Sequence, residues 1–407
     1  MKKSILREYA RLIVRVGANV QQGQEVRIRA GLDQPEFVTM VVEEAYRAGA
    51  RKVIMEWFYQ PISKLDSRYQ TVETMGTVEE WEKARMEHNC AVVPVRIFLD
   101  SADPDGMKGD NAQKRSEARK LSYPILKPYT DRLEGHDQWC IAAVPGAAWA
   151  RKVFPGLTKN QAVEKLWEAI LFTSRVTDDP VKAWQEHDRN LAEHCRRLND
   201  LQITSLHYTA QNGTDFTVGL IPEAQFCGGD ETSLDGITFN PNIPTEECFT
   251  SPRRGDAEGI VYATKPLSYQ GQLIDHFSIR FEQGRAVEVH AETGEELLRT
   301  MISMDEGAAY LGECALVPQA SPIAESGLLF YNTLFDENAA CHLALGMGFM
   351  DCIRVYSRYT LDEVRKLGIN DSMIHVDFMI GCDSMNIDAL CADGTTVRIF
   401  ENGNWAI

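Results

Sequence analysis

A strand, a helix and a second strand follow one another near the start of the chain, and this order constrains the fold more than any other feature. Residues 25–29 (EVRIR) and 51–57 (RKVIMEW) have the composition of strands. Between them, residues 35–49 fit a helix with Pro in its first turn, apolar residues three and four positions apart, and Gly at its end. A strand–helix–strand unit of about thirty residues joins parallel strands. The sequence therefore predicts a parallel sheet.

Similar elements continue to residue 200, and the character of the sequence then changes. Further strands are predicted at 90–99 and 139–144, and helices at 3–16, 111–121 and 159–200. From residue 201, Gly, Thr and short alternating segments dominate, with strands predicted at 203–209, 215–220, 259–264, 273–281 and 286–290. The predicted fold class is α/β, with an N-terminal α/β domain containing the parallel sheet at 1–200. A β-rich α+β C-terminal domain is predicted at 201–407.

The composition excludes several classes of protein. The 407 residues include 42 Lys and Arg against 59 Asp and Glu, a formal net charge of −17. Nucleic acid is not an expected partner, because neutralising phosphates takes clustered Lys and Arg. No apolar run reaches the length of about 18 residues that a membrane helix needs, and charges interrupt the apolar residues near the start, so no signal peptide is expected. The ten cysteines never form CxxC, which favours reduced thiols. We expect a cytoplasmic protein without a membrane partner.

The segment IHVDFMIG (374–381) gives the clearest geometric signal for a functional site. In a strand, residues two apart point to the same face, so His375 and Asp377 are expected to project together. A charged Asp beside a His in an apolar strand is costly unless both are compensated, and a metal ion would compensate both. A plain His–Asp hydrogen bond in a partly exposed strand explains the same pattern.

The segment FDENAACHLALG (335–346) holds Asp336, Glu337 and His342 at the start of an apolar stretch that is compatible with a helix. Glu337 and His342 are five residues apart, about 140° around a helix, so this is not the HExxH arrangement. Both reach one ion if Glu337 precedes the first helical turn. The alternative is an acidic helix start with His342 as a core residue.

Two further carboxylates complete the set of proposed metal ligands. Glu247, with Glu246 before it, lies in NIPTEECFTSP (242–252), and Glu313 lies in GECALVP (312–318). Alone, each is explained as a solvated acid near proline. Together with the two histidines they suit zinc, cobalt or manganese, and more than four ligands indicates two ions. Two ions lower the pKa of a shared water and hold a substrate oxygen, as in two-metal hydrolases. The chain has no GxGxxG, Walker-type or GxSxG motif, so a nucleotide cofactor or a serine nucleophile lacks support.

At these segments the sequence resembles the thermophilic metallo-aminopeptidases of the aminopeptidase T and aminopeptidase S type. The resemblance runs along most of the chain and includes EAYRAGARKV, LHYTAQNGTDFTVGL, DEGAAYLGECALVP and NTLFDENAACHLALG. It implies an exopeptidase with two divalent ions per chain, a catalytic metal-binding C-terminal domain, homodimeric assembly and peptide substrates with a free N-terminus. The metal-binding positions that it implies are Glu247, Glu313, Glu337, His342, His375 and Asp377. Glu337 is also the implied catalytic base.

One residue departs from the pattern of this family. A tyrosine thought to assist the reaction intermediate usually follows the DENAxxHxAxG motif, and here HLALGMGFMD places Phe349 at that position. Phenylalanine cannot donate a hydrogen bond, and a lost donor slows turnover unless another group replaces it.

Two alternatives to the aminopeptidase therefore stay open. The first is a ring-opening dioxygenase that holds a single iron with His342, His375 and Asp377. The second is a catalytically impaired relative that binds metal or peptide. The number of ions per chain separates the dioxygenase from the hydrolase.

Overall fold

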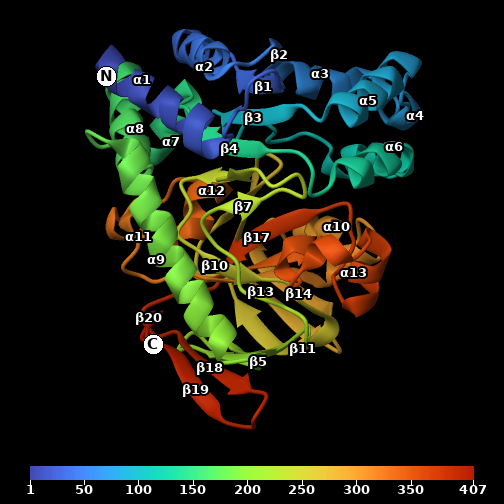
Figure 1. The fold of residues 1–407 in the computed structure, drawn as a ribbon. Helices are drawn as coiled ribbons and strands as arrows, with labels where there is room; N and C mark the ends of the chain where they lie inside the picture. Colours follow the sequence, from blue (N-terminus) through green and yellow to red (C-terminus); the bar gives the residue numbers. More distant parts are fainter. The chain divides into compact units, whose positions relative to one another are not determined.

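The computed structural model describes residues 1–407, and the chain divides into two compact units. Unit 1 comprises Met1–Asp188 and Asp230–Thr245, and unit 2 comprises Arg189–Gly229 and Glu246–Ile407. The division falls inside the long helix α9 (Pro180–Asp200), which is visible in Figure 1. The predicted domain limits at residue 200 stay a prediction, because compact packing does not test whether either part folds alone.

Unit 1 contains a five-stranded sheet in which all neighbours are parallel, in the order β2-β1-β3-β4-β9. Its strands are β1 (Glu25–Gly31), β2 (Lys52–Phe58), β3 (Val95–Asp100), β4 (Trp139–Ala143) and β9 (Asn242–Ile243). Helix α2 (Pro35–Ala48) connects β1 to β2. It has Pro35 in its first turn and stops at Gly49, whose φ of 106° is left-handed. The predicted strand–helix–strand unit and parallel sheet are confirmed.

The helices of unit 1 pack through an aromatic core. They are α1 (Lys3–Leu12) with the π-helical turn η1 (Ile13–Gly17), α3 (Gln60–Tyr69), α4 (Val72–Gly76), α5 (Glu80–Val92), α6 (Ala112–Leu133), α7 (Ala147–Val153) and α8 (Lys159–Thr173). A short hairpin, β7 (Glu231–Thr232) with β8 (Thr238–Phe239), also belongs to this unit. The ring of Phe37 on α2 packs against those of Tyr9 on α1 and Trp167 on α8, with centroids 5.4 and 5.2 Å away. Burial of these rings holds the three helices together.

Two predicted elements of unit 1 differ from the structure. The strand expected at 90–99 is partly wrong, because α5 continues to Val92 and only the later part forms β3. The helix ends where Val93 adopts a left-handed φ of 45° before Pro94. A short apolar run does not by itself distinguish the end of a helix from a strand. The helix expected at 159–200 is two helices, α8 and α9, separated at 174–179.

Unit 2 contains a nine-stranded sheet in the order β12-β13-β11-β6-β5-β18-β19-β20, with β14 paired to β13. Its strands are β5 (Ile203–Thr209), β6 (Asp215–Leu220), β11 (Pro252–Tyr262), β12 (Leu267–Tyr269), β13 (Gln272–Glu282), β14 (Arg285–Thr293), β18 (Asn386–Cys391), β19 (Thr396–Glu401) and β20 (Asn404–Trp405). Strand β18, near the end of the chain, pairs with β5, almost two hundred residues earlier (Figure 1). The predicted β-rich character of the second half is confirmed.

A second, four-stranded antiparallel sheet of unit 2 has the order β10-β15-β16-β17. Its strands are β10 (Cys248–Thr250), β15 (Leu311–Leu316), β16 (His342–Gly346) and β17 (His375–Met379). Phe378 on one face of β17 contacts Phe277 of β13, with ring centroids 5.9 Å apart. Because side chains alternate along a strand, His375 and Asp377 point to the opposite face. This opposite face carries the polar site described below.

Short helical segments connect the strands of unit 2. They are α10 (Glu295–Ile302), α11 (Pro322–Glu325), α12 (Thr333–Asp336) and α13 (Leu361–Leu367), with the 3-10 turns η2 (Gly307–Ala309), η3 (Glu337–Ala339), η4 (Met350–Cys352) and η5 (Tyr356–Arg358). Nowhere in the structure is a helix both long and apolar enough to cross a membrane.

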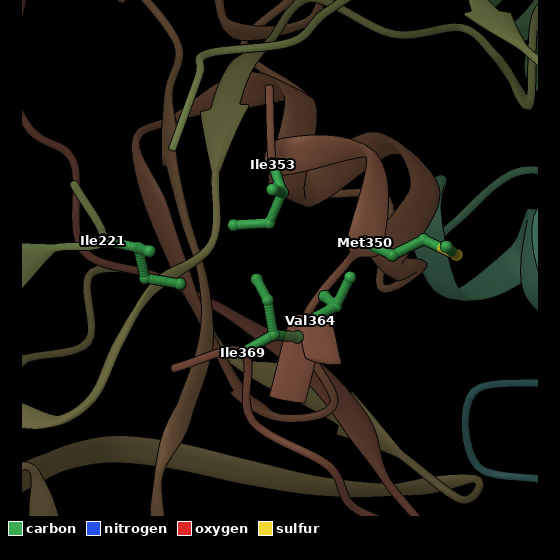
Figure 2. Packing of buried hydrophobic residues seen from close by; sticks show 5 residues of the cluster. All are labelled: Ile221, Met350, Ile353, Val364 and Ile369. Atoms are coloured by element: carbon green, nitrogen blue, oxygen red, sulfur yellow. The ribbon is translucent and has the colours of Figure 1, made fainter. Parts of the chain in front are cut away.

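A small apolar cluster fixes the segment that follows β16. It consists of Ile221, Met350, Ile353, Val364 and Ile369, all buried. Figure 2 shows Ile353, Val364 and Ile369 pointing toward a common centre, with Ile221 beside them. Met350 and Ile353 thereby hold the chain around η4 against α13.

Candidate metal centre

The register of the four-stranded sheet brings distant acids and histidines to one face. Glu313 on β15 lies opposite Ala344 on β16, and Ala344 lies opposite Asp377 on β17. In the next row, Gly346 lies opposite His375. Ala344 and Gly346 have almost no side chain, so the longer side chains of the two flanking strands meet above the middle strand.

The contacts across this face form two overlapping groups. Nε2 of His375 lies 3.1 Å from Oε2 of Glu313 and 3.3 Å from Oδ1 of Asp377. Nε2 of His342 lies 3.1 Å from Oε2 of Glu247. Within each group of three, Glu247–Glu313–His342 and Glu313–His375–Asp377, one ligand atom per residue lies within 4.8 Å of the others. Glu313 belongs to both groups.

The segment 335–346 reaches the site without the helix that its composition suggested. Helix α12 ends at Asp336, Glu337 opens the 3-10 turn η3, and Ala340 is extended with φ −163° and ψ 156°. His342 is then the first residue of a strand. The run HLALG, which is compatible with a helix by composition, forms a strand because it pairs with both β15 and β17.

Backbone carbonyls orient both imidazoles. Nδ1 of His375 lies 2.7 Å from the carbonyl oxygen of Met347, and Nδ1 of His342 lies 3.2 Å from that of Ala340. An Nδ1–H that donates to a carbonyl leaves Nε2 facing the carboxylates. This orientation is common among metal-binding histidines.

Burial and mutual repulsion raise the pKa values of two carboxylates of the site. Burial, together with the charges of Glu247 and Asp377, raises the pKa of Glu313 to about 7 although His375 opposes the shift. Burial and the charges of Asp377 and Glu247 raise the pKa of Glu337 well above its usual range. Glu337 is outside both groups of three, but the Asn338 side chain that donates to its buried carboxylate also accepts from the backbone N–H of Glu246, next to Glu247.

The two histidines respond to the same charges. Burial disfavours the imidazolium of His342, but the hydrogen bond and charge of Glu247 outweigh it and raise the pKa to about 10. The pKa of His375 is also raised well above its usual value, because Asp377 and Glu313 outweigh burial.

The donor set fits divalent metal ions. Its four carboxylates, those of Glu247, Glu313, Glu337 and Asp377, outnumber its two imidazoles, and all four are buried. Buried charge of one sign requires compensation, which cations at the two groups supply. Carboxylate and imidazole without thiolate suits zinc, cobalt or manganese.

Two features of the site were not predicted from the sequence. Asn338 is fully buried, accepts a hydrogen bond from the backbone N–H of Glu246 at 2.6 Å, and donates to Oε1 of Glu337 at 3.3 Å. It thereby links the chain around Glu247 to Glu337. Asn338 is the Asn of the DENA motif, and its place between Glu337 and the following segment was the only sequence signal for this role. The second feature is a contact of Phe349, which the sequence singled out without indicating its neighbour: its ring centroid lies 4.7 Å from that of His375.

Comparison with known proteins agrees with this geometry. The sequence matches the family described as thermophilic metalloprotease (M29) over residues 2–405. It is 41% identical over 403 residues to aminopeptidase AmpS of Bacillus subtilis, covering 98% of each chain. It is 38% identical over 407 residues to aminopeptidase T of Thermus thermophilus, covering 100% of this chain and 99% of the relative.

A solved structure shows the same fold. The structure of wild-type AmpT from Thermus thermophilus matches with a TM-score of 0.87 and covers 100% of both chains. The expected resemblance and fold class are confirmed at full length. The chain therefore belongs to the M29 family of thermophilic metalloproteases, and it is an aminopeptidase, a metal-dependent exopeptidase.

Proposed function

We propose that this aminopeptidase holds two divalent ions, one at Glu247–Glu313–His342 and one at Glu313–His375–Asp377. The observation that carries the proposal is the position of Glu313 in both groups of three. A carboxylate has two oxygens, so one such residue can serve two neighbouring ions. Ions bound there would lower the pKa of a water molecule and polarise the carbonyl oxygen of the scissile bond.

The role that we assign to Glu337 is the general base. Its carboxylate is buried but belongs to neither group of three, which suits proton transfer better than ligation. In this role it accepts a proton from the attacking water and returns it to the leaving amine. Asn338 holds Oε1 of Glu337 and so orients the carboxylate.

Exopeptidase selectivity requires a group that recognises the free N-terminus of the substrate. We propose that one of the ions or a nearby carboxylate holds the free α-amino group of the peptide, which an N-acetylated peptide lacks. We propose zinc, cobalt or manganese as the ions, a homodimer of the 45.8 kDa chain, and a cytoplasmic location.

Hydrolysis of aminoacyl p-nitroanilides and of dipeptides tests this function. After chelation and dialysis, activity should return on addition of cobalt, zinc or manganese, and N-acetylated substrates should not be cleaved. A folded, metal-loaded protein that cleaves none of these substrates would contradict the proposal.

Glu337→Gln separates the two roles of Glu337. If Glu337 is the base, Glu337→Gln should retain the metal content and lower kcat about 10²–10⁴-fold. Loss of an ion from this variant would instead make Glu337 a ligand. Glu306→Gln is a matched control, because Glu306 is an exposed carboxylate of the same unit that pairs with Arg254.

A further inference from the structure

The candidate centre is most open at one residue. The side chain of His375 is 25% exposed, whereas those of Glu313 and His342 are 5% and 1% exposed. Asp377, which pairs with His375, is the next most open of the residues in the two groups of three. The centre is therefore most accessible to a substrate on the side of His375.

Two phenylalanines line this side. The ring of Phe349 is tilted by 47° against the imidazole of His375 at a centroid distance of 4.7 Å. The ring of Phe249 meets Phe349 edge-on, 5.6 Å away. Both phenylalanines are partly exposed. They form an apolar surface, which we call the Phe249–Phe349 wall, next to an otherwise charged centre.

Backbone contacts hold the wall in place before any substrate arrives. Phe249 and Cys227 exchange two backbone hydrogen bonds of 2.8 Å. The N–H of Phe349 donates to Oγ of Ser251 at 2.8 Å, and the next residue, Met350, belongs to the buried cluster of Figure 2. A fixed surface selects ligands without the cost of ordering mobile side chains.

We propose that the Phe249–Phe349 wall contacts the side chain of the substrate's N-terminal residue and makes the enzyme prefer large apolar residues there. The inference rests on the proposed aminopeptidase centre. The N-terminal residue is the one whose amine and carbonyl both lie at such a centre, so its side chain projects from a carbon atom beside the reacting bond. Phenyl rings offer no hydrogen bond to a polar side chain.

The test compares p-nitroanilides of leucine, phenylalanine, alanine and lysine, which vary the N-terminal residue and keep the leaving group constant. For the wild type, kcat/KM for leucine should exceed that for alanine at least about 10-fold, as expected when an apolar surface receives additional methylene groups. Phe349→Ala and Phe249→Ala should each reduce this ratio toward one. Phe349→Tyr, which keeps the ring, should retain it.

Phe172→Ala is the matched control, because Phe172 is an exposed phenylalanine in unit 1. It should leave the leucine-to-alanine ratio unchanged. Metal content and thermal midpoint are measured for every variant, and if one wall variant does not fold, the other still gives the ratio. Inhibition by free leucine and by glycine supplies a binding readout, and the preference for leucine should weaken in both wall variants.

Two results would overturn the inference. One is a leucine-to-alanine ratio that stays constant in both folded wall variants. The other is a loss of selectivity confined to the second residue, seen with dipeptides of constant N-terminus. A wild type that cleaves no substrate at all would instead refute the proposed centre, so the two failures are distinguishable.

Discussion

Asn338→Ala probes how the candidate centre is held together. The side chain of Asn338 accepts from the N–H of Glu246 at 2.6 Å and donates to the carbonyl of Leu334 at 2.9 Å and to Oε1 of Glu337 at 3.3 Å. Alanine removes all three hydrogen bonds and leaves the backbone otherwise unchanged. Because Glu247 directly follows Glu246, the truncation also frees the chain that presents Glu247 to His342.

Asn338→Ala should lower both the stability of the metal-free protein and its affinity for metal. Three buried hydrogen bonds at about 1 kcal/mol each predict that the metal-free protein loses about 3 kcal/mol of unfolding free energy. Release of the segment that presents Glu247 should also lower metal affinity. Loss of a residue that orients a metal ligand typically lowers this affinity about 10- to 100-fold. At a fixed excess of metal, the stabilisation that the metal provides should then fall by about 1.4–2.7 kcal/mol.

Gln138→Ala is the control for this variant. Gln138 is also a buried amide and makes three hydrogen bonds, with Gln24, Ala18 and Asn19. It lies in unit 1, whereas all six proposed site residues lie in unit 2. Gln138→Ala should lower the unfolding free energy of the metal-free protein by a similar amount. It should leave the stabilisation that added metal provides unchanged.

The assay is urea unfolding of both variants and the wild type, each with and without added zinc. Equal stabilisation by metal in Asn338→Ala and Gln138→Ala would refute the assignment of Asn338 as a positioning residue.

Three further predictions concern stability and pH. Ile353→Ala, in the cluster of Figure 2, should cost about 2–5 kcal/mol in urea unfolding and leave the metal content unchanged. Gly346→Ala should lower metal content as well as stability. Its φ of 107° costs about 1–3 kcal/mol for a non-glycine residue. A Cβ there would also lie 2.0 Å from the carbonyl oxygen of Ile374 and so displace the neighbouring His375. An unchanged metal content in Gly346→Ala would contradict this prediction. Burial and the charge of Arg175 lower the pKa of His187 to about 4, so the unfolded chain binds the proton first and stability falls as pH decreases from about 6.5 to 4. Between pH 7 and 5 the unfolding free energy should fall by about 2 kcal/mol through His187, and urea unfolding of His187→Gln should not show this decrease.

Local periodicity predicted part of the site well. The alternation of IHVDFMIG placed His375 and Asp377 on one face, and the structure confirms this placement in β17. The strand–helix–strand unit of 25–57 was equally predictable, because its helix carries both start and stop signals.

Long-range pairing was the part that local patterns did not reveal. HLALG suits a helix or a strand, and its place between β15 and β17 decides the outcome. The same pairing makes Ala344 and Gly346 important, because their small size lets Glu313 reach His375. The contact of Glu247 with His342 joins residues almost a hundred positions apart. The motifs that carry the family resemblance supplied this information indirectly.

The ring of Phe349 on His375 gives a structural setting to the residue that departs from the family's usual tyrosine. A hydroxyl added by Phe349→Tyr should raise kcat if a missing donor at this position limits turnover. An unchanged kcat would show that this position does not limit the reaction.

The number of metal ions per chain tests the central claim most directly. Elemental mass spectrometry of the reconstituted and dialysed protein should find two divalent ions per chain, and Glu313→Gln should weaken both because Glu313 belongs to both groups. Glu306→Gln should keep two. A single ion per chain, iron in particular, would contradict the two-metal centre.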